Sequence, residues 1–395
     1  MKLLYKSEIE DIKKSGYLKS DISITDALIE NFYEEILTLE EKKLLKLAFK
    51  NNPSQEELDE VLKLWDIEVK GANKSLLLSY VLKRHPDLKF SSYEGPRLKG
   101  LLKFFRFQNM KVISHFVKIT KVLNDNNIIP MILKGGAMRH LVKDLPRVMG
   151  DVDILVLEKD FYKAIKLALP LGYYFEKIDV HSVDLHDDKT KENTLDIHKF
   201  IYFKTGKPKA FLKDLFKRAS LQNVFGVKAY VPSDEDMVFI ILVNLARNLR
   251  DKTSLGGLIY SLFDCKYFLE KNKDFNWEIV KENAKKTKTQ IQMNFAMKFI
   301  NKISCDIFPL EFQKEALFEE KTNNYSNTVM YERFYLEDIR EKSRNLKIKE
   351  IFKDLSKFKQ YLKIKPLYFS LKLLRGHPLL IKFFIKDLKT KQYDF

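Results

Sequence analysis

The chain has 395 residues, of which 45% are hydrophobic, and it contains few glycines (13) and prolines (11), so long disordered or low-complexity stretches are not expected. The length predicts two or three packed units with enough apolar material for a sizeable core. The formal net charge of +17 favours anionic partners such as nucleotides, nucleic acid, phosphorylated glycans or an anionic membrane surface, although a biased composition explains the spread lysines equally well.

Cysteine content and the N-terminal sequence both favour a cytoplasmic location. Two cysteines, Cys265 and Cys305, are too few for a disulfide framework or a CxxC metal site. The first residues, MKLLYKSEIEDIKKSG, carry acidic groups where a signal peptide needs an apolar stretch, so export is not expected. No window of about 18 uninterrupted apolar residues predicts a transmembrane helix.

The first 94 residues are predicted to form an N-terminal helical region. Apolar residues recur at three- and four-residue spacing in 24–49, and Asn52-Pro53-Ser54 interrupts that pattern. Ser54, followed by Glu56 and Glu57, indicates a new helix start. The helical pattern continues in residues 73–84 and 98–126.

Residues 95–230 are predicted to form a small α/β core. The segment 128–136 is a short apolar run closed by two glycines, as in a buried strand that ends in a tight turn. Further strands, helices and a polar turn follow in an order that indicates a mixed sheet. The predicted helices are 137–145 and 159–172, the strands 151–157, 173–178, 180–186 and 194–203, and the turn 187–193.

After about residue 210 the chain is predicted to return to helices, and residues 231–395 form a C-terminal helical region. Val231-Pro232-Ser233 indicates a helix start with Ser233 as its N-cap. Residues 255–270 and 277–303 are predicted to be helical as well. The predicted fold class is therefore α+β, with a small mixed sheet, flanking helices and a mainly helical remainder.

Asp151 and Asp153 are the strongest candidates for metal ligands. Residues two apart on a strand project from the same face, so both carboxylates can converge while Val152 points into the core. Asp196 lies on a later strand and can join them if that strand is a neighbour. Converging carboxylates supply the hard oxygen ligands that Mg²⁺ prefers. A DxD pair alone is weak evidence, because most such pairs are solvated strand starts.

Gly135 and Gly136 are candidates for phosphate binding. Without a Cβ, a turn lets backbone amides approach phosphate oxygens, and the following helix N-terminus adds partial positive charge. The alternative is an ordinary turn between a strand and a helix.

The run from Met131 to Val156 resembles the nucleotidyltransferase superfamily that includes DNA polymerase β, and more narrowly the bacterial "uncharacterised nucleotidyltransferase" family. The resemblance spans about residues 95–300, and its matching motifs occur in the expected order. The motifs are Leu133-Lys134-Gly135, Arg147, Asp151-Val152-Asp153-Ile154-Leu155-Val156, Leu195-Asp196-Ile197-His198 and Val231-Pro232-Ser233-Asp234-Glu235-Asp236.

The resemblance implies a role for each matching residue. Asp151, Asp153 and Asp196 would bind metal, and Asp196 would also activate the acceptor hydroxyl. Gly135 and Gly136 would hold the triphosphate, although many relatives have serine at the position of Gly136. The basic residues nearby are further candidates for phosphate binding, with a solvated surface charge or a salt bridge to the acidic cluster itself as the alternative for each. They are Lys134, Arg139 and Arg147.

Other polar groups have a structural explanation beside the functional one. His198 is expected to be a core or supporting histidine rather than a ligand. A polar hairpin is favoured over a metal cluster for His181, His186, Asp187 and Asp188. A polar helix stripe and a contact to nucleobase, ribose or acceptor are both open for Asn244, Arg247 and Arg250. Segment 366–388 is expected to pack against the helical region or to contact an anionic membrane surface.

The main hypothesis is a cytoplasmic nucleotidyltransferase that uses Mg²⁺, with two ions as the resemblance implies and with Mn²⁺ as the other candidate. Its partners would be a nucleoside triphosphate and an acceptor, which the sequence leaves open between a sugar phosphate, a small molecule, a protein side chain and an RNA end. The alternatives are a regulatory protein that keeps the fold without turnover and a nucleic-acid-binding protein. Three intact carboxylates argue against the former, and the lack of a recognised RNA module against the latter.

Overall fold

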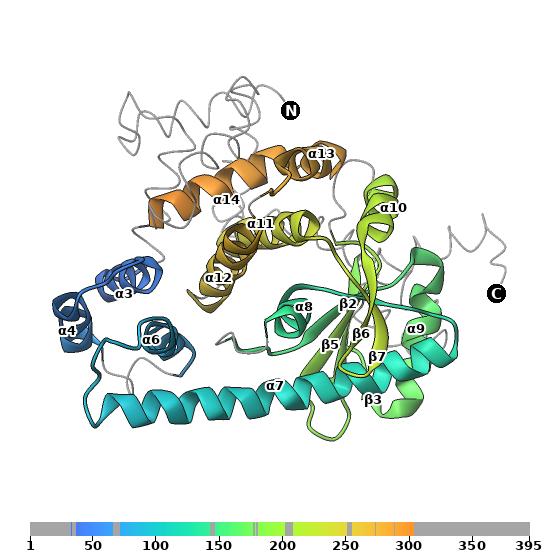
Figure 1. The fold of residues 1–395 in the computed structure, drawn as a ribbon. Helices are drawn as coiled ribbons and strands as arrows, with labels where there is room; N and C mark the ends of the chain where they lie inside the picture. The colour runs from blue at the N-terminus through green and yellow to red at the C-terminus, as the bar shows by residue number, and fades with distance from the viewer. Residues whose placement is uncertain are drawn as a thin grey trace, which may run out of the picture.

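The chain folds around one mixed β-sheet with helices packed against it (Figure 1). The computed structural model describes residues 33, 37–65, 72–142, 147–176, 178, 181–201, 208–250, 255–272, 274–287 and 289–303. Within that part the sheet has 7 strands in the order β3-β4-β5-β2-β1-β7-β6. The predicted α+β class, with a small mixed sheet and a mainly helical remainder, is therefore confirmed.

The strands are short, and most of them lie between residues 131 and 198. They are β1 (Met131–Ile132), β2 (Val152–Leu155), β3 (Tyr173–Tyr174), β4 (Ser182–Asp187), β5 (Asn193–His198), β6 (Ser220–Val224) and β7 (Val227–Val231).

The helices precede, interrupt and follow these strands. They are α3 (Leu39–Phe49), α4 (Gln55–Leu64), α6 (Ala72–Arg84), α7 (Glu94–Asp125), α8 (Lys134–Leu141), α9 (Phe161–Ala168), α10 (Pro208–Arg218), α11 (Asp234–Arg250), α12 (Leu255–Lys271), α13 (Trp277–Thr287) and α14 (Gln290–Ile303), with single 3₁₀ turns at Glu158–Asp160 and Leu169–Leu171.

The centre of the sheet combines parallel and antiparallel pairs. β2 is parallel to β5 and antiparallel to β1, and β1 is parallel to β7. The outer pairs are antiparallel hairpins, β3 with β4, β4 with β5, and β6 with β7. All four residues of β2 are buried, as expected for a central strand with both faces covered.

The β6–β7 hairpin corrects the prediction that the chain is helical after about residue 210. Its turn places Phe225 and Gly226 at φ +53° and +92°, the left-handed pair that a two-residue hairpin turn needs. The Asn223 side chain accepts a hydrogen bond from the Gly226 amide at 2.9 Å, which supports the turn. A Phe-Gly pair is a weaker sequence signal for a hairpin turn than Asn-Gly. The alternation of apolar and polar residues in β7 is therefore easily missed.

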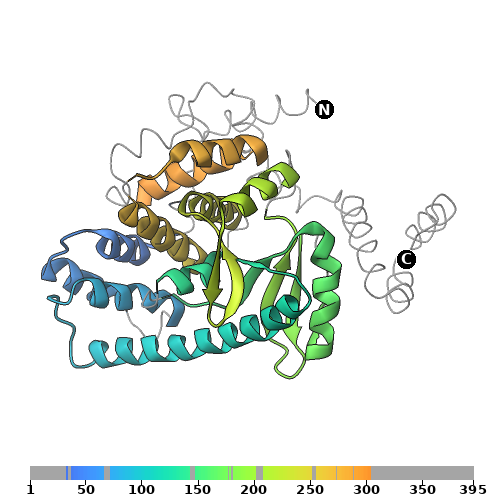
Figure 2. The ribbon, with the colours of Figure 1, turned by 45° about the vertical axis from the view of Figure 1, so that its right-hand side comes forward.

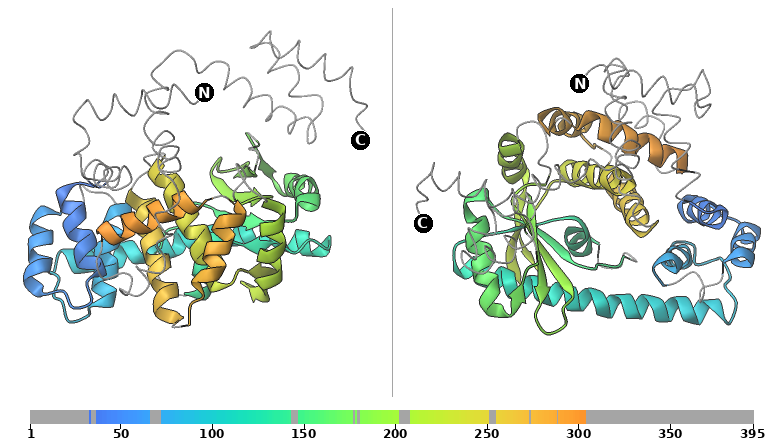
Figure 3. Two further views of the ribbon diagram at one scale, coloured as in Figure 1. Left: turned by 90° about the horizontal axis from the view of Figure 1, so that it is seen from above. Right: turned by 180° about the vertical axis from the view of Figure 1, so that it is seen from behind.

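Long helices lie on two sides of the sheet. α7 has 32 residues and runs along one side of the described structure, from α6 to α9 (Figures 1 and 2). It contacts β2, β5 and β7, and it also packs against α9. Helices α11–α14 lie on the opposite side from α7, where α11 contacts α12, α13 and α14 (Figure 3).

Two predicted helix starts are confirmed by their capping bonds. The Ser54 hydroxyl accepts from the Glu57 amide, and the Glu57 carboxylate accepts from the Ser54 amide, a complete capping box. Ser233 Oγ accepts from the Asp236 amide at 3.3 Å at the start of α11. Part of the predicted helix 24–49 lies outside the described residues, while its C-terminal end forms α3.

The boundaries of the three predicted regions, 1–94, 95–230 and 231–395, stay a prediction. They coincide with the beginning of α7 and the end of β7, but nothing in the packing tests whether the regions are separate domains. Among the helices that the structure describes, none is long and apolar enough to cross a bilayer.

Candidate active site

Three aspartates form a row across adjacent strands on one face of the sheet. Asp153 on β2 pairs directly with Asp196 on β5, and Asp196 pairs directly with Asp184 on β4. Residues that lie directly opposite on neighbouring strands project from the same face. The residues between them point to the other face and are buried in the core, namely Val152, Ile154, Val183, Leu185, Leu195 and Ile197.

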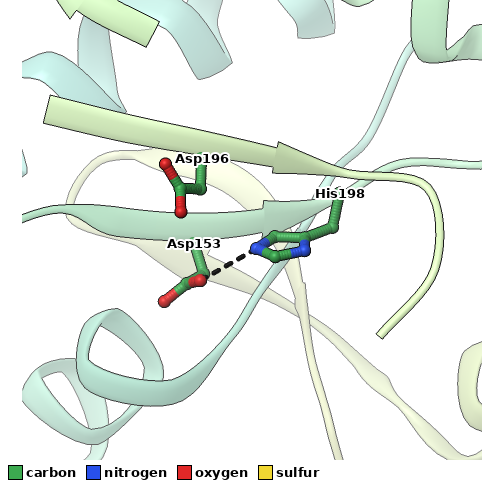
Figure 4. A group of neighbouring side chains, drawn as sticks. All are labelled: Asp153, Asp196 and His198. Atoms are coloured by element: carbon green, nitrogen blue, oxygen red, sulfur yellow. Dashed lines mark hydrogen bonds and ion pairs between the residues drawn. The ribbon is translucent and has the colours of Figure 1, made fainter. Parts of the chain in front are cut away.

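The inner part of this row meets a histidine. Asp153, Asp196 and His198 each offer one ligand atom, and these atoms all lie within 4.8 Å of one another (Figure 4). Asp153 Oδ1 is 2.8 Å from His198 Nε2. Asp153 and His198 are buried, and Asp196 is half-buried. The expectation that His198 supports a carboxylate agrees with this contact, although its position also makes it a potential ligand.

Lys134 approaches the same oxygen of Asp153 from the other side. Its Nζ donates to Asp153 Oδ1 at 2.5 Å. Its backbone has φ +44°, a left-handed conformation that is uncommon for a residue with a side chain and that often marks a functional site. Lys134 and His198 both bind Oδ1. Asp153 Oδ2 therefore has no hydrogen-bond partner among the described residues, and this oxygen can bind a ligand.

Asp151 lies in the turn before β2 and is half-buried. It is not part of the Asp153–Asp196–His198 group, so its predicted role as a ligand stays a prediction. Burial and the negative charges of Asp153 and Asp184 raise the pKa of Asp151 to about 6, against the opposing effect of Lys134. The Asp151 carboxyl group is therefore electrostatically coupled to the row.

The aspartates of the row differ in how easily they ionise. Burial alone would raise the pKa of Asp153, but Lys134 and His198 outweigh it and hold that pKa well below its usual range. Burial, together with repulsion from Asp151, Asp153 and Asp184, raises the pKa of Asp196 to about 9. The ionised form is thus favoured at Asp153 and disfavoured at Asp196.

This donor set fits a hard divalent cation. Carboxylate oxygens from neighbouring strands are the ligands that Mg²⁺ and Mn²⁺ favour. The crowding of like charges around Asp196 is a cost that a bound cation would relieve. The residues present therefore suit a metal ion, held by Asp153 and Asp196 with His198 beside them.

The two glycines lie in the first turn of α8, not in a separate turn before it, which corrects the sequence prediction. The N-cap residue of α8, Leu133, gives no side-chain capping bond, so the first turn keeps amides that can bind an anion. A Cβ at Gly135 would lie 3.0 Å from Arg147 Nε. A Cβ at Gly136 would lie 2.9 Å from Ile132 and 3.0 Å from Val152, so this glycine lets α8 pack closely on the sheet.

Gly136→Ala should therefore destabilise the protein by about 1–3 kcal/mol through overpacking. Gly100→Ala is a matched control, because Gly100 is also helical and an added Cβ there meets nothing within 4 Å. That control should leave stability unchanged or raise it by up to about 1 kcal/mol through helix propensity. Urea unfolding of both variants measures the difference, and equal stabilities would contradict the packing role of Gly136.

Arg147 is bound by the C-terminal helices. Its Nη1 donates to Asp264, and its guanidinium carbon lies 4.9 Å from the centre of the Tyr260 ring. Burial raises the pKa of Asp264 to about 6, although Arg147 opposes this shift. Arg147 thus forms its salt bridge with Asp264 and not with the acidic cluster, and its predicted contact with phosphate stays a prediction. Arg139 is a half-buried residue of α8, and its predicted contact with phosphate stays a prediction.

Three residues near the site escaped the sequence reasoning. Asp184 shares the row with Asp196, and its place in the alternating segment 180–186 was the available signal. Asn109 on α7 donates to the Arg147 carbonyl oxygen at 2.6 Å and accepts from the Met149 amide at 2.9 Å. Asp264 pairs with a residue 117 positions away, so no local pattern points to it.

The other polar candidates lie where the structural explanation favours them. Asp187 accepts from the Lys189 and Thr190 amides in the turn after β4, and Asp188 pairs with Lys191. In the described part of the chain these residues, His181 and His186 belong to no metal-binding group. Asn244 is half-buried on α11, and the side chains of Arg247 and Arg250, like segment 366–388, lie outside the described residues.

The structure thus brings the glycine-containing start of α8 and the carboxylates of adjacent strands into one region of the fold. Residues 73–303, more than half of the chain, match the family described as uncharacterised nucleotidyltransferase. The chain belongs to that family, which makes it an enzyme of the nucleotidyltransferase class. No similar protein was found among the curated proteins.

Three solved structures have distant similarity to the chain. ANT(2'')-Ia, an antibiotic-resistance factor studied in solution, is 11% identical with a TM-score of 0.34, over 47% of this chain and 94% of that one. A crystal structure of ANT(2'')-Ia with adenylyl-2''-tobramycin is 12% identical with a TM-score of 0.26, over 49% and 98%. A nucleotidyltransferase-like antigenic protein from Paracoccidioides brasiliensis is 13% identical with a TM-score of 0.24, over 42% and 89%.

Proposed function

We propose that the protein transfers a nucleoside monophosphate from a nucleoside triphosphate to a hydroxyl group of an acceptor, with Mg²⁺ as cofactor. The acceptor oxygen forms a bond to the α-phosphorus, and the bond from that phosphorus to the leaving pyrophosphate breaks. The observation that supports this best is the direct pairing of Asp153 with Asp196 on parallel strands. Their carboxylates, with ligand atoms within 4.8 Å of each other, can share one cation site.

Asp151, Asp153 and Asp196 would hold the metal. Two bound Mg²⁺ ions would stabilise the charge on the attacking and leaving oxygens. Asp153 would bind a metal ion through Oδ2, because Lys134 and His198 both bind Oδ1. His198 would keep the Asp153 carboxylate oriented, as supporting hydrogen bonds do for carboxylates that bind metals.

The triphosphate would lie at the N-terminus of α8. The uncapped first turn of that helix offers backbone amides at Gly135 and Gly136, and the helix dipole favours negative charge there. Lys134 at the beginning of the helix, Arg139 one turn later and Arg147 beside Gly135 would add positive charge. The cationic groups would thus bind the phosphates that leave as pyrophosphate.

Asp196 would take the proton of the acceptor hydroxyl. Among the three proposed ligands it has the highest pKa, about 9, because burial and three neighbouring carboxylates disfavour its charged form. A bound metal cation would restore the charged form, which is the form that can accept the proton. Asp196 lies one strand further than Asp153 from β1, the strand that leads into α8, which supports a role at the acceptor rather than at the leaving group.

Incubation with each α-labelled nucleoside triphosphate, Mg²⁺ and a panel of acceptors tests this function. The wild type should transfer label to an acceptor, and Asp151→Ala/Asp153→Ala should lose this by roughly a thousandfold or more, since metal stabilisation is worth several kcal/mol. Asp188→Ala is the control, because Asp188 is an exposed carboxylate of the neighbouring turn. No nucleotide binding by the wild type, or equal transfer by the double variant, would rule the function out.

A further inference from the structure

One edge of the Arg147 guanidinium is held by α12. Nη1 donates to Asp264, which is 2% exposed, and it lies 3.5 Å from the Tyr260 carbonyl oxygen. The guanidinium carbon is 4.9 Å from the centre of the Tyr260 ring, so an aromatic face supports the flat group. Asp264 and Tyr260 are one helical turn apart, and together they fix the guanidinium on one side.

The other edge of the same guanidinium points to α8. An ideal Cβ at Gly135 would lie 3.0 Å from Arg147 Nε and 3.2 Å from Nη2, so both nitrogens lie above this glycine. Nε is buried and has no hydrogen-bond partner among the described residues. A buried charged donor without an acceptor is costly. An anion bound over the first turn of α8 would supply the missing acceptor for Arg147 Nε.

The main chain of Arg147 is held as firmly as its side chain. Asn109 on α7, which is 2% exposed, binds the Arg147 carbonyl oxygen at 2.6 Å and the Met149 amide at 2.9 Å. Its side-chain amide thus fixes the loop that leads to Asp151. The position of Arg147 is therefore set by α7 and α12, two helices outside the sheet.

We propose that Asp264 is a positioning residue that aims the Nε–Nη2 edge of Arg147 at the phosphates of the bound nucleotide above Gly135. The inference rests on the proposed function, because it requires that α8 receives the triphosphate. Nε and Nη2 form the fork with which arginine binds two oxygens of one phosphate, while Nη1 stays with Asp264. The C-terminal helical region thereby contributes to the nucleotide site through a single buried carboxylate.

Binding of inorganic tripolyphosphate in the presence of Mg²⁺ tests this proposal without knowledge of the base. Isothermal titration calorimetry compares the wild type, Arg147→Gln, Asp264→Asn and the double variant, at a temperature at which circular dichroism finds all of them folded. Arg147→Gln should weaken binding by about tenfold or more, as expected for a lost charged bidentate contact. Asp264→Asn should weaken it by about threefold to tenfold, and the double variant should bind no more weakly than Arg147→Gln alone.

Asp236→Asn is the matched control for a purely structural effect. Asp236 is fully buried and pairs with Arg218 at 2.6 Å, so it joins α10 to α11 by an equally buried arginine–aspartate contact. Its substitution should lower the unfolding temperature and leave tripolyphosphate affinity unchanged. An equal loss of affinity in this control would overturn the proposal.

The remaining outcomes separate this inference from the proposed function. The inference alone fails if the wild type binds tripolyphosphate and either Asp264→Asn or Arg147→Gln binds it equally well. It also fails if the effects of the two substitutions add in the double variant. If the wild type binds neither tripolyphosphate nor any nucleoside triphosphate, the proposed function fails together with the inference.

Discussion

Asp196→Asn should abolish nucleotidyl transfer while it stabilises the metal-free protein. The carboxyl group is surrounded by Asp151, Asp153 and Asp184, which, together with burial, raise its pKa to about 9. Asparagine keeps the shape and cannot ionise, so folding no longer requires Asp196 to take up a proton or to carry a charge among these carboxylates. The expected gain in the free energy of unfolding is about 1–3 kcal/mol near neutral pH, after allowance for solvent screening of a half-buried group.

The size of this gain depends on pH. In the folded protein Asp196 keeps its proton up to a pKa of about 9, whereas in the unfolded chain it loses the proton near pH 4. The stability that the bound proton contributes is therefore complete below about pH 4 and is lost as the pH rises through 9. The advantage of Asp196→Asn over the wild type should be larger at pH 8 than at pH 5.

Urea unfolding in EDTA at both pH values measures this effect, and label transfer measures activity. Transfer should fall by roughly a thousandfold, since the variant loses a proposed metal ligand and proton acceptor. A less stable variant at pH 8, or one that retains transfer, would contradict the role assigned to Asp196. Asp188→Asn, at an exposed carboxylate, should change neither property.

Lys134→Met should have the opposite effect on stability. The Lys134 ammonium lies 2.5 Å from Asp153 Oδ1, and the Asp153 residue is 6% exposed. Removal of one partner from a buried ion pair leaves an uncompensated charge and typically costs about 3–5 kcal/mol. His198 still contacts Asp153, so the free energy of unfolding of the metal-free protein should fall by about 3 kcal/mol, the lower end of that range.

The pH dependence and the response to metal identify the cause of this loss. The pKa of Asp153 is held below its usual range by Lys134 and His198 against the effect of burial, so the stability from this pair is present above about pH 4 and is lost on acidification. Mg²⁺ should stabilise Lys134→Met more than the wild type, because the ion replaces the missing positive charge.

Urea unfolding with EDTA and with Mg²⁺ provides the measurement. Lys163→Met is the control, since Lys163 is an exposed lysine that binds only the Asn126 carbonyl oxygen in the described structure. Its stability should equal that of the wild type in both conditions. If Mg²⁺ stabilises Lys134→Met no more than the wild type, Lys134 does not compensate the charge of a metal site.

Local patterns in the sequence predicted the elements that carry the site. The apolar run before the glycines, the strand pattern of 151–157 and the serine caps at residues 54 and 233 depend on neighbours within a few positions, and the structure has the corresponding elements. The hairpin of β6 and β7 was not predicted, because its Phe225-Gly226 turn carries a weak signal.

Contacts between distant segments could not be predicted in the same way. The convergence of Asp196 with Asp153 was expected mainly through the family resemblance, and Asp184 was not considered at all. Strand order and register depend on how whole strands pack, and a shift by one residue would turn every side chain to the other face. For the same reason the close packing of α8 on Ile132 and Val152, which Gly136 allows, was not predicted.

By itself the sequence determined the kind of chemistry, since carboxylates two apart on a strand and glycines at a helix start are properties of residue type and short-range spacing. The tertiary structure decided how those groups differ from one another. It placed Lys134 and His198 on one oxygen of Asp153 and left Asp196 among like charges. It also bound Arg147 to Asp264 on α12, because burial and charge depend on what surrounds a residue in space.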